Sequence, residues 1–160
     1  MRDAIGGAWL FGLVAIFIVI FSGYLAVSIN YSKAFKIKDE VISMIETSEG
    51  MHGNTEPKIE NYLNSSGYNV YGSCGTDRGT GLLPKSTAES DKFKYCVCKV
   101  KDSASKSGME IYSYEITVFF RLDLPVLGNI FTFPVPGKTK AIYYANNQGS
   151  SKVIVDCPTI

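Results

Sequence analysis

The first third of the chain changes along its length from uniformly apolar to amphipathic. Residues 6–30, GGAWLFGLVAIFIVIFSGYLAVSIN, contain no charged side chain. In residues 31–50, YSKAFKIKDEVISMIETSEG, apolar positions recur at helical spacing, and lysines and acids lie mostly between them. Because neither stretch contains proline and the second has no glycine before Gly50, the pattern predicts one helix over residues 4–48.

The apolar part of this predicted helix is long enough to cross a membrane, which takes about 20 residues. It is longer than the ~7–15-residue apolar region of a secretory signal, and no A-x-A cleavage site follows it. Trp9 and Tyr31 lie near its two ends, about 33 Å apart at 1.5 Å per residue, as in an aromatic belt. We therefore predict a retained membrane helix.

A stripe of small residues at heptad spacing runs along the otherwise bulky apolar segment. It consists of Ala8, Gly12, Ala15, Val19, Ser22 and Ala26. Such stripes let helix backbones approach closely in an apolar medium, where packing drives association. The pattern favours assembly of this helix with copies of itself, although small residues are also common in membrane helices that do not associate.

The rest of the chain has the length and the pattern of one compact β-rich domain. We predict an α+β protein, with a membrane or assembly helix in residues 1–50 and an antiparallel β-sheet head in residues 51–160. The head's predicted elements are a short helix over 54–67, a short strand over 68–74, longer strands over 93–101, 110–124 and 138–146, and an edge strand near the C-terminus.

The central predicted strand alternates between apolar and polar positions. Tyr112, Tyr114, Ile116, Val118, Phe120 and Leu122 share one face, whereas Ser113, Glu115, Thr117 and Arg121 lie on the other. This alternation predicts one buried face and one wetter face.

Two connections in the head differ in character. Residues 75–92 read as a long polar loop with glycines and a proline, and residues 102–109 as a hairpin loop. The link over 125–137, PVLGNIFTFPVPG, is apolar and carries three prolines. It is predicted either to cover the core or to form a contact surface.

The four cysteines all follow the apolar segment, at Cys74, Cys96, Cys98 and Cys157. An even number in such a domain predicts two disulfides formed in an oxidising compartment. Cys96 and Cys98 lie two apart on a predicted strand, so each is expected to bond elsewhere. Two pairings remain open: 74–96 with 98–157, or 74–98 with 96–157. A zinc site or a redox C-x-C pair fits the spacing less well.

Composition and motifs favour a structural role over catalysis or nucleic-acid binding. The net charge is +1, from 16 basic and 15 acidic residues, and this near balance gives no case for nucleic-acid binding, which would need a basic patch or stripe. His52 is the single histidine, and no hydrolase, nucleotide-binding or metalloprotease motif is present. We expect no enzymatic activity, no cofactor and no metal site.

The charges beside the apolar segment bear on orientation and on assembly. The lysines after Tyr31 would by themselves place the head in the cytoplasm. The cysteines place it outside, and because large domains translocate largely regardless of flanking charge we follow the cysteines. Arg2 and Asp3 precede the apolar segment. Their expected role is solvation or helix capping, or charge pairing with a neighbouring subunit.

A short charged N-terminus, a long apolar-then-amphipathic helix and a disulfide-tied antiparallel head resemble bacterial type IV pilin-like proteins. Within them the chain is most similar to the pseudopilins of the tight-adherence (Tad) secretion system. The close of the chain, ITVFFRLDLPVLGNIFTFPVPGKTKAIYYA, looks like the strand–Leu-Pro–strand end of those proteins. One departure is that the family's glutamate just inside the apolar helix is missing, because residues 4–38 contain no acid.

The resemblance implies a filament subunit or an assembly component at the bacterial cell surface. Its helices would pack in a central bundle with the heads outside, after storage in the membrane and passage through a pilus assembly platform. The alternative is a single-pass membrane protein whose extracytoplasmic head binds a ligand or a partner protein. A membrane-anchored thiol or metal enzyme is a weaker third possibility.

Overall fold

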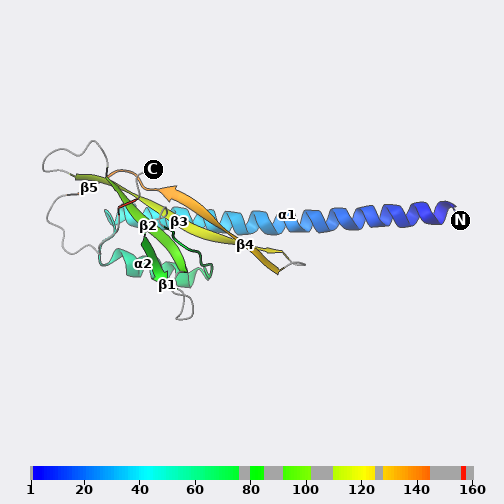
Figure 1. Ribbon diagram of the computed structural model, residues 1–160, viewed down its shortest axis with the longest axis horizontal. Coiled ribbons are helices and arrows are strands. Elements are labelled where there is room, and N and C mark those ends of the chain that lie inside the picture. The colour runs from blue at the N-terminus through cyan, green and yellow to red at the C-terminus, as the bar shows by residue number, and fades with distance from the viewer. Residues whose placement is uncertain are drawn as a thin grey trace.

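The computed structural model describes residues 2–75, 80–84, 92–101, 110–124, 128–144 and 156–157, with side chains left out for residues 2–6 and for part of the strands. A single long helix, α1 (Arg2–Thr47), projects from a small head that is built around its second half (Figure 1). The chain therefore has the predicted α+β architecture of a long N-terminal apolar helix followed by a small antiparallel sheet.

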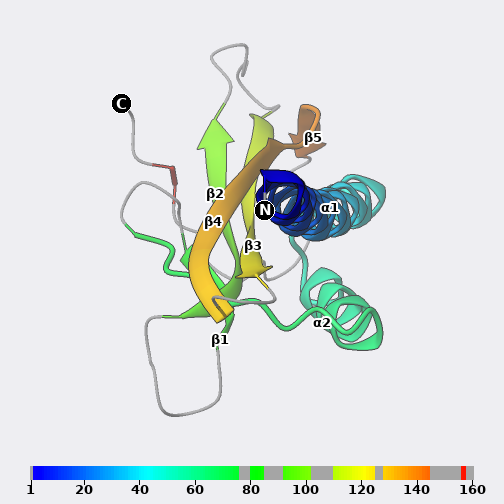
Figure 2. The same ribbon diagram turned by 90° about the vertical axis from the view of Figure 1, so that its right-hand side faces the viewer.

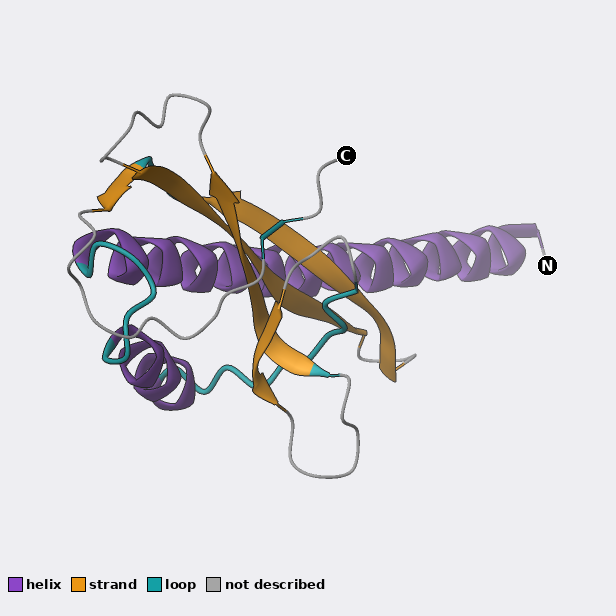
Figure 3. Ribbon diagram, turned by 60° about the vertical axis from the view of Figure 1, so that its left-hand side comes forward, coloured by secondary structure: helices purple, strands orange, loops and turns teal. Residues whose placement is uncertain are grey.

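The head contains one antiparallel sheet in the order β1-β2-β3-β4, and β5 also pairs with β3. Its strands cross α1 obliquely (Figure 3). Their bounds are β1 (Thr80–Pro84), β2 (Phe93–Lys101), β3 (Glu110–Leu124), β4 (Gly128–Lys138) and β5 (Ile142–Tyr144). The predicted strands 93–101 and 110–124 are confirmed, and they pair as a hairpin whose connecting residues 102–109 lie outside the described part of the chain.

The main core lies between the sheet and the second half of α1. Helix α1 buries residues three or four apart, as expected of an amphipathic helix; they are Ala34, Ile37, Val41 and Ile45. The second helix, α2 (Thr55–Ser65), adds Ile59 and Leu63 from the same side of the sheet (Figure 2). Gly67 ends α2 with a positive φ of 64°, as the sequence predicts.

The face of β3 toward α1 is buried as predicted from Tyr112 to Val118 and partly buried at Phe120, and the Leu122 side chain lies outside the described residues. The opposite face is less wet than its polar residues indicate. Ser113, Thr117 and Phe119 are buried there, whereas Glu115 is exposed. Cys74 and Cys96 pack with Phe119 in a second small cluster. The loop after α2 therefore covers part of the face that the alternation alone assigns to solvent.

Three predictions about the strands are wrong. The link over 125–137 contains β4, the hairpin partner of β3, and its prolines are accommodated because β4 is an edge strand. Residues 80–84 of the predicted polar loop form β1, and residues 68–74 contribute only an isolated bridge between Gly72 and Phe93. The predicted C-terminal edge strand lies mostly outside the described residues. Of its described residues, Asp156 forms an isolated parallel bridge with Lys99.

Of the strand expected over 138–146, the described residues contain only Lys138, which ends β4, and the short strand β5; residues 139–141 are not strand. The Thr139 side-chain oxygen accepts the N–H of Tyr114 at 2.9 Å, and the Thr139 N–H donates to the Tyr114 carbonyl at 2.9 Å. A side chain thus replaces one backbone partner in the ladder. As a result β4 and β5 follow each other along the same edge of β3.

Candidate functional site

The first half of α1 stands apart from the head and exposes a continuous apolar surface (Figure 1). It is the one helix among the described residues that is long and apolar enough to cross a membrane, and its most apolar stretch is not buried. Exposed apolar patches of this size are covered by lipid or by protein. The helix therefore suggests membrane anchoring.

The small-residue stripe lies entirely within this exposed half. At 100° per residue, the positions from Ala8 to Ala26 fall within an arc of roughly 80°. Around its N-terminal end is a shallow hollow lined by Ala8, Trp9, Gly12, Leu13 and Ile16. A Cβ atom added at Gly12 would meet no atom within 4 Å, so a second helix has room to approach there.

Of the remaining members of the stripe, Ala15, Val19 and Ser22 are exposed and Ala26 is partly exposed. The Ser22 hydroxyl donates to the Ile18 carbonyl at 2.7 Å, which satisfies this polar group within the helix. Arg2 and Asp3 lie in the first turn of α1, but their side chains are outside the described residues, so their predicted charge pairing stays a prediction.

Both disulfides are present, in one of the two pairings that the sequence left open. Cys74 bonds Cys96, and Cys98 bonds Cys157. The ligand atoms of three residues, Cys98, Cys157 and Glu115, lie close enough together to bind one metal ion. Both sulfurs belong to the disulfide, however, so the Glu115 carboxylate is the one group of the three that could bind an ion. Disulfides point to an extracytoplasmic location for the head.

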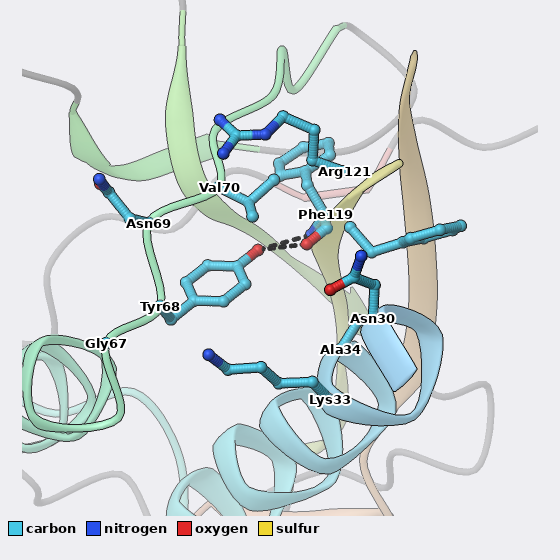
Figure 4. Close-up of a pocket in the computed structure, with 10 residues that line it drawn as sticks. Asn30, Lys33, Ala34, Gly67, Tyr68, Asn69, Val70, Phe119 and Arg121 are labelled. Carbon is cyan, nitrogen blue, oxygen red and sulfur yellow. Dashed lines mark hydrogen bonds between the residues drawn. The ribbon is translucent and has the colours of Figure 1, made fainter. Parts of the chain in front are cut away.

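A small cavity lies where α1 enters the head, and we call it the junction cavity. Its volume is about 170 Å³, and it is lined by Asn30, Lys33 and Ala34 of α1, the loop 67–70, and residues 119–121 of β3. Lys33 and Arg121 lie on either side of Tyr68 (Figure 4). The cavity is smaller than the ~300–1,000 Å³ of typical ligand pockets, and its two cations suit a small anionic group.

Tyr68 fixes the loop beside this cavity to the central strand. Its hydroxyl donates to the Phe119 carbonyl at 2.6 Å and accepts the Phe119 N–H at 2.8 Å (Figure 4). Burial raises the pKa of Tyr68 well above its usual value, so the hydroxyl stays protonated and able to donate even in alkaline solution. The wall of the cavity is therefore held by buried hydrogen bonds.

Four aromatic side chains, the junction aromatics, lie beside the cavity at the base of the head; they are Tyr31, Phe120, Phe131 and Phe133. Tyr31 meets Phe120 edge-on with ring centroids 5.7 Å apart, and Phe120 stacks on Phe133 at 5.2 Å. Phe131 contacts Phe133 at 6.0 Å. The group joins α1 to the β3–β4 hairpin.

Reasoning from the sequence missed both the cavity and the junction aromatics. The available signal was the F-T-F spacing of Phe131 and Phe133, which places both rings on one face of a strand. Because proline disfavours a strand, Pro134 and Pro136 led to a prediction of a connecting segment here instead of β4. Without β4, nothing indicated that these rings are linked to Tyr31 through Phe120.

Comparison of the chain with protein-family models, with curated proteins and with solved structures finds no match.

Proposed function

We propose that this protein is a structural subunit of an extracellular pilus-like filament, or of the machinery that assembles or primes one, and that it polymerises through the first half of α1. The observation that carries the proposal is the division of α1 into two halves. The second half is part of the head's core, whereas the first half exposes large apolar side chains from Trp9 to Ile29 and carries the small-residue stripe.

Physical chemistry favours two successive environments for this exposed half. Its large apolar side chains would be covered by lipid before assembly. The stripe then gives neighbouring copies a face for close packing, because association in an apolar medium depends on packing. At 1.5 Å per residue the 46-residue helix is roughly 69 Å long, enough to place the heads outside a helical bundle.

A groove on the head favours the second candidate function, a single-pass membrane protein that binds a ligand or a partner. It has a volume of about 560 Å³ on the sheet face away from α1, and Pro134, Pro136 and the disulfide cysteine Cys98 line it. Glu115 and Lys138 pair across it at 3.5 Å. In this function the protein would remain a monomer.

The stripe can be tested by filling it with large side chains. We expect Gly12→Leu combined with Ala15→Leu to abolish oligomers and filaments while leaving the head folded, because leucines would keep the helix backbones apart. Ser28→Leu is the control, since Ser28 lies roughly 160° around the helix from Gly12. Chemical crosslinking, negative-stain microscopy of shed surface material and the circular dichroism of the head are the measurements.

Oligomers unchanged by the double substitution would count against the stripe. Recovery of detergent-soluble monomer alone from the parent chain, with no filaments in the shed material, would favour the second candidate function.

A further inference from the structure

The junction aromatics remain partly exposed although they contact one another. The exposed fraction is 47% for Tyr31, 60% for Phe131 and 42% for Phe133. Their position coincides with the end of the predicted membrane-spanning segment, because Tyr31 directly follows the uncharged segment 6–30. It lies 22 residues after Trp9, which corresponds to about 33 Å along the helix and matches a ~30 Å hydrocarbon layer.

The β3–β4 hairpin extends beyond this aromatic layer toward the N-terminus of α1. Phe120 pairs with Phe133, and the two strands continue to Leu124 and Gly128 in that direction (Figure 1). In the sequence, residues 122–131, LDLPVLGNIF, contain Asp123 as their single charged residue. When α1 spans a bilayer, the ends of β3 and β4 at Leu124 and Gly128 are the described part of the head nearest to the lipid.

Two cationic side chains line the junction cavity beside the aromatic rings. Lys33 lies two residues after Tyr31, toward the head, whereas Arg121 pairs with Thr132 and is level with the stretch between Phe131 and Phe133. No acidic residue occurs on α1 between Ala4 and Lys38. Along α1 the order is apolar segment, Tyr31 and then Lys33, which is the order that a bilayer presents as hydrocarbon, interface and anionic headgroups. Arg121 adds a second cation level with the aromatic rings, within the interface.

We propose that the base of the head is a lipid-binding surface, in which the junction aromatics lie in the bilayer interface and Lys33 and Arg121 bind the phosphate groups of anionic lipids at the junction cavity. The surface is continuous with the segment of α1 that is suited to span the membrane, and this favours lipid over a second copy of the chain. The inference rests on membrane anchoring by α1 and does not depend on filament assembly.

Depth-dependent fluorescence quenching tests the aromatic layer. The full chain carrying Trp9→Phe and Phe131→Trp is reconstituted in phosphatidylcholine–phosphatidylglycerol nanodiscs that hold one chain each. The control carries Trp9→Phe and Tyr143→Trp, because Tyr143 is similarly exposed at 66% but lies on β5, at the opposite end of the head from the hairpin tip (Figure 1). Lipids brominated in the upper acyl chain act as the quencher.

We expect a blue-shifted tryptophan emission that loses most of its intensity with brominated lipid for Phe131→Trp, and neither effect for Tyr143→Trp. Unquenched, water-like emission from Phe131→Trp would overturn the proposal. It would also be overturned by an emission that is shielded only when many chains share a membrane and that brominated lipid leaves unquenched, because a second copy would then occupy the surface.

Charge substitutions test the role of Lys33 and Arg121 in the same nanodiscs. Raising the phosphatidylglycerol fraction is expected to increase quenching of Phe131→Trp, and Lys33→Gln with Arg121→Gln should remove this dependence. Lys140→Gln is the matched control, since Lys140 pairs with Glu46 at 3.7 Å near the far end of α1 and should change nothing. Free inorganic phosphate that abolishes the dependence at constant ionic strength would assign the cavity to a soluble anion and overturn the lipid assignment.

Discussion

Two buried tyrosines of the head differ in what their hydroxyl groups contact. The Tyr68 hydroxyl bonds both backbone groups of Phe119. The Tyr95 hydroxyl is buried without a hydrogen-bond partner among the described residues. Burial raises the pKa of both side chains. A buried polar group stabilises a fold only when it is paired, so the same residue type has opposite effects at the two positions.

We expect Tyr68→Phe to lower the free energy of unfolding by about 1–3 kcal/mol, because it leaves the buried N–H and carbonyl of Phe119 without their partner. Tyr95→Phe should be neutral or stabilising, since it removes an unpaired hydroxyl. Urea unfolding monitored by circular dichroism measures both. Equal losses for the two variants would contradict the assigned hydrogen bonds.

A residue-scale steric constraint occurs at Gly72, where the chain passes over the central strand. A Cβ atom there would lie 2.3 Å from the ring of Phe119, which is fully buried and cannot move aside. Gly72→Ala should therefore cost about 1–3 kcal/mol of unfolding free energy through overpacking. Gly53→Ala is the control, because no atom lies within 4 Å of its added Cβ. Similar stabilities for the two variants would show that the loop can shift.

At the scale of elements, β2 is the strand to which both disulfides attach. Cys96 and Cys98 lie on its face away from α1 and bond the loop after α2 and the C-terminal segment. The two bridges close loops of different length, with sequence separations of 22 and 59. On this face of β2 the two disulfides hold the neighbouring segments in place, whereas on the other face α1 packs against apolar side chains of the strand.

Loss of the longer bridge should destabilise the head more than loss of the shorter one. Chain-entropy arguments give about 3 kcal/mol for Cys74→Ser with Cys96→Ser, and about 4 kcal/mol for Cys98→Ser with Cys157→Ser. The midpoint and slope of urea unfolding of the oxidised proteins measure the difference. A reversed order would mean that the packing of Cys96 against Phe119 outweighs loop closure.

At the scale of the whole molecule, α1 belongs to two environments. Its first half is exposed, and its second half supplies Ile37, Val41 and Ile45 to the core of the head. Each such side chain contributes about 1.5–3 kcal/mol on burial, whereas small domains have only about 5–15 kcal/mol of stability in total. We therefore expect the smallest stably folded part of the chain to include the second half of α1.

A chain shortened to residues 30–160 is expected to fold and to unfold cooperatively, whereas a chain shortened to residues 51–160 is not, because it lacks the helix that covers the sheet. Thermal unfolding by circular dichroism and the dispersion of amide proton signals distinguish the two. Cooperative unfolding of the shorter chain would show that the β-sheet and α2 form a core without α1.

The sequence by itself predicted the long helix, its change from apolar to amphipathic, strands β2 and β3, and the cysteines that form disulfides. These features depend on local periodicity and on residue type, which a single sequence carries. Strand β4 was missed because its prolines oppose a strand locally, and only its position at the sheet edge makes them acceptable.

The tertiary structure alone decided the disulfide pairing, the burial of the second face of β3, and the meeting of Tyr31 with the β3–β4 hairpin. Each of these joins residues that are far apart in the chain. Their proximity follows from how the strands pair and how α1 crosses the sheet, and no local pattern of residues encodes that arrangement.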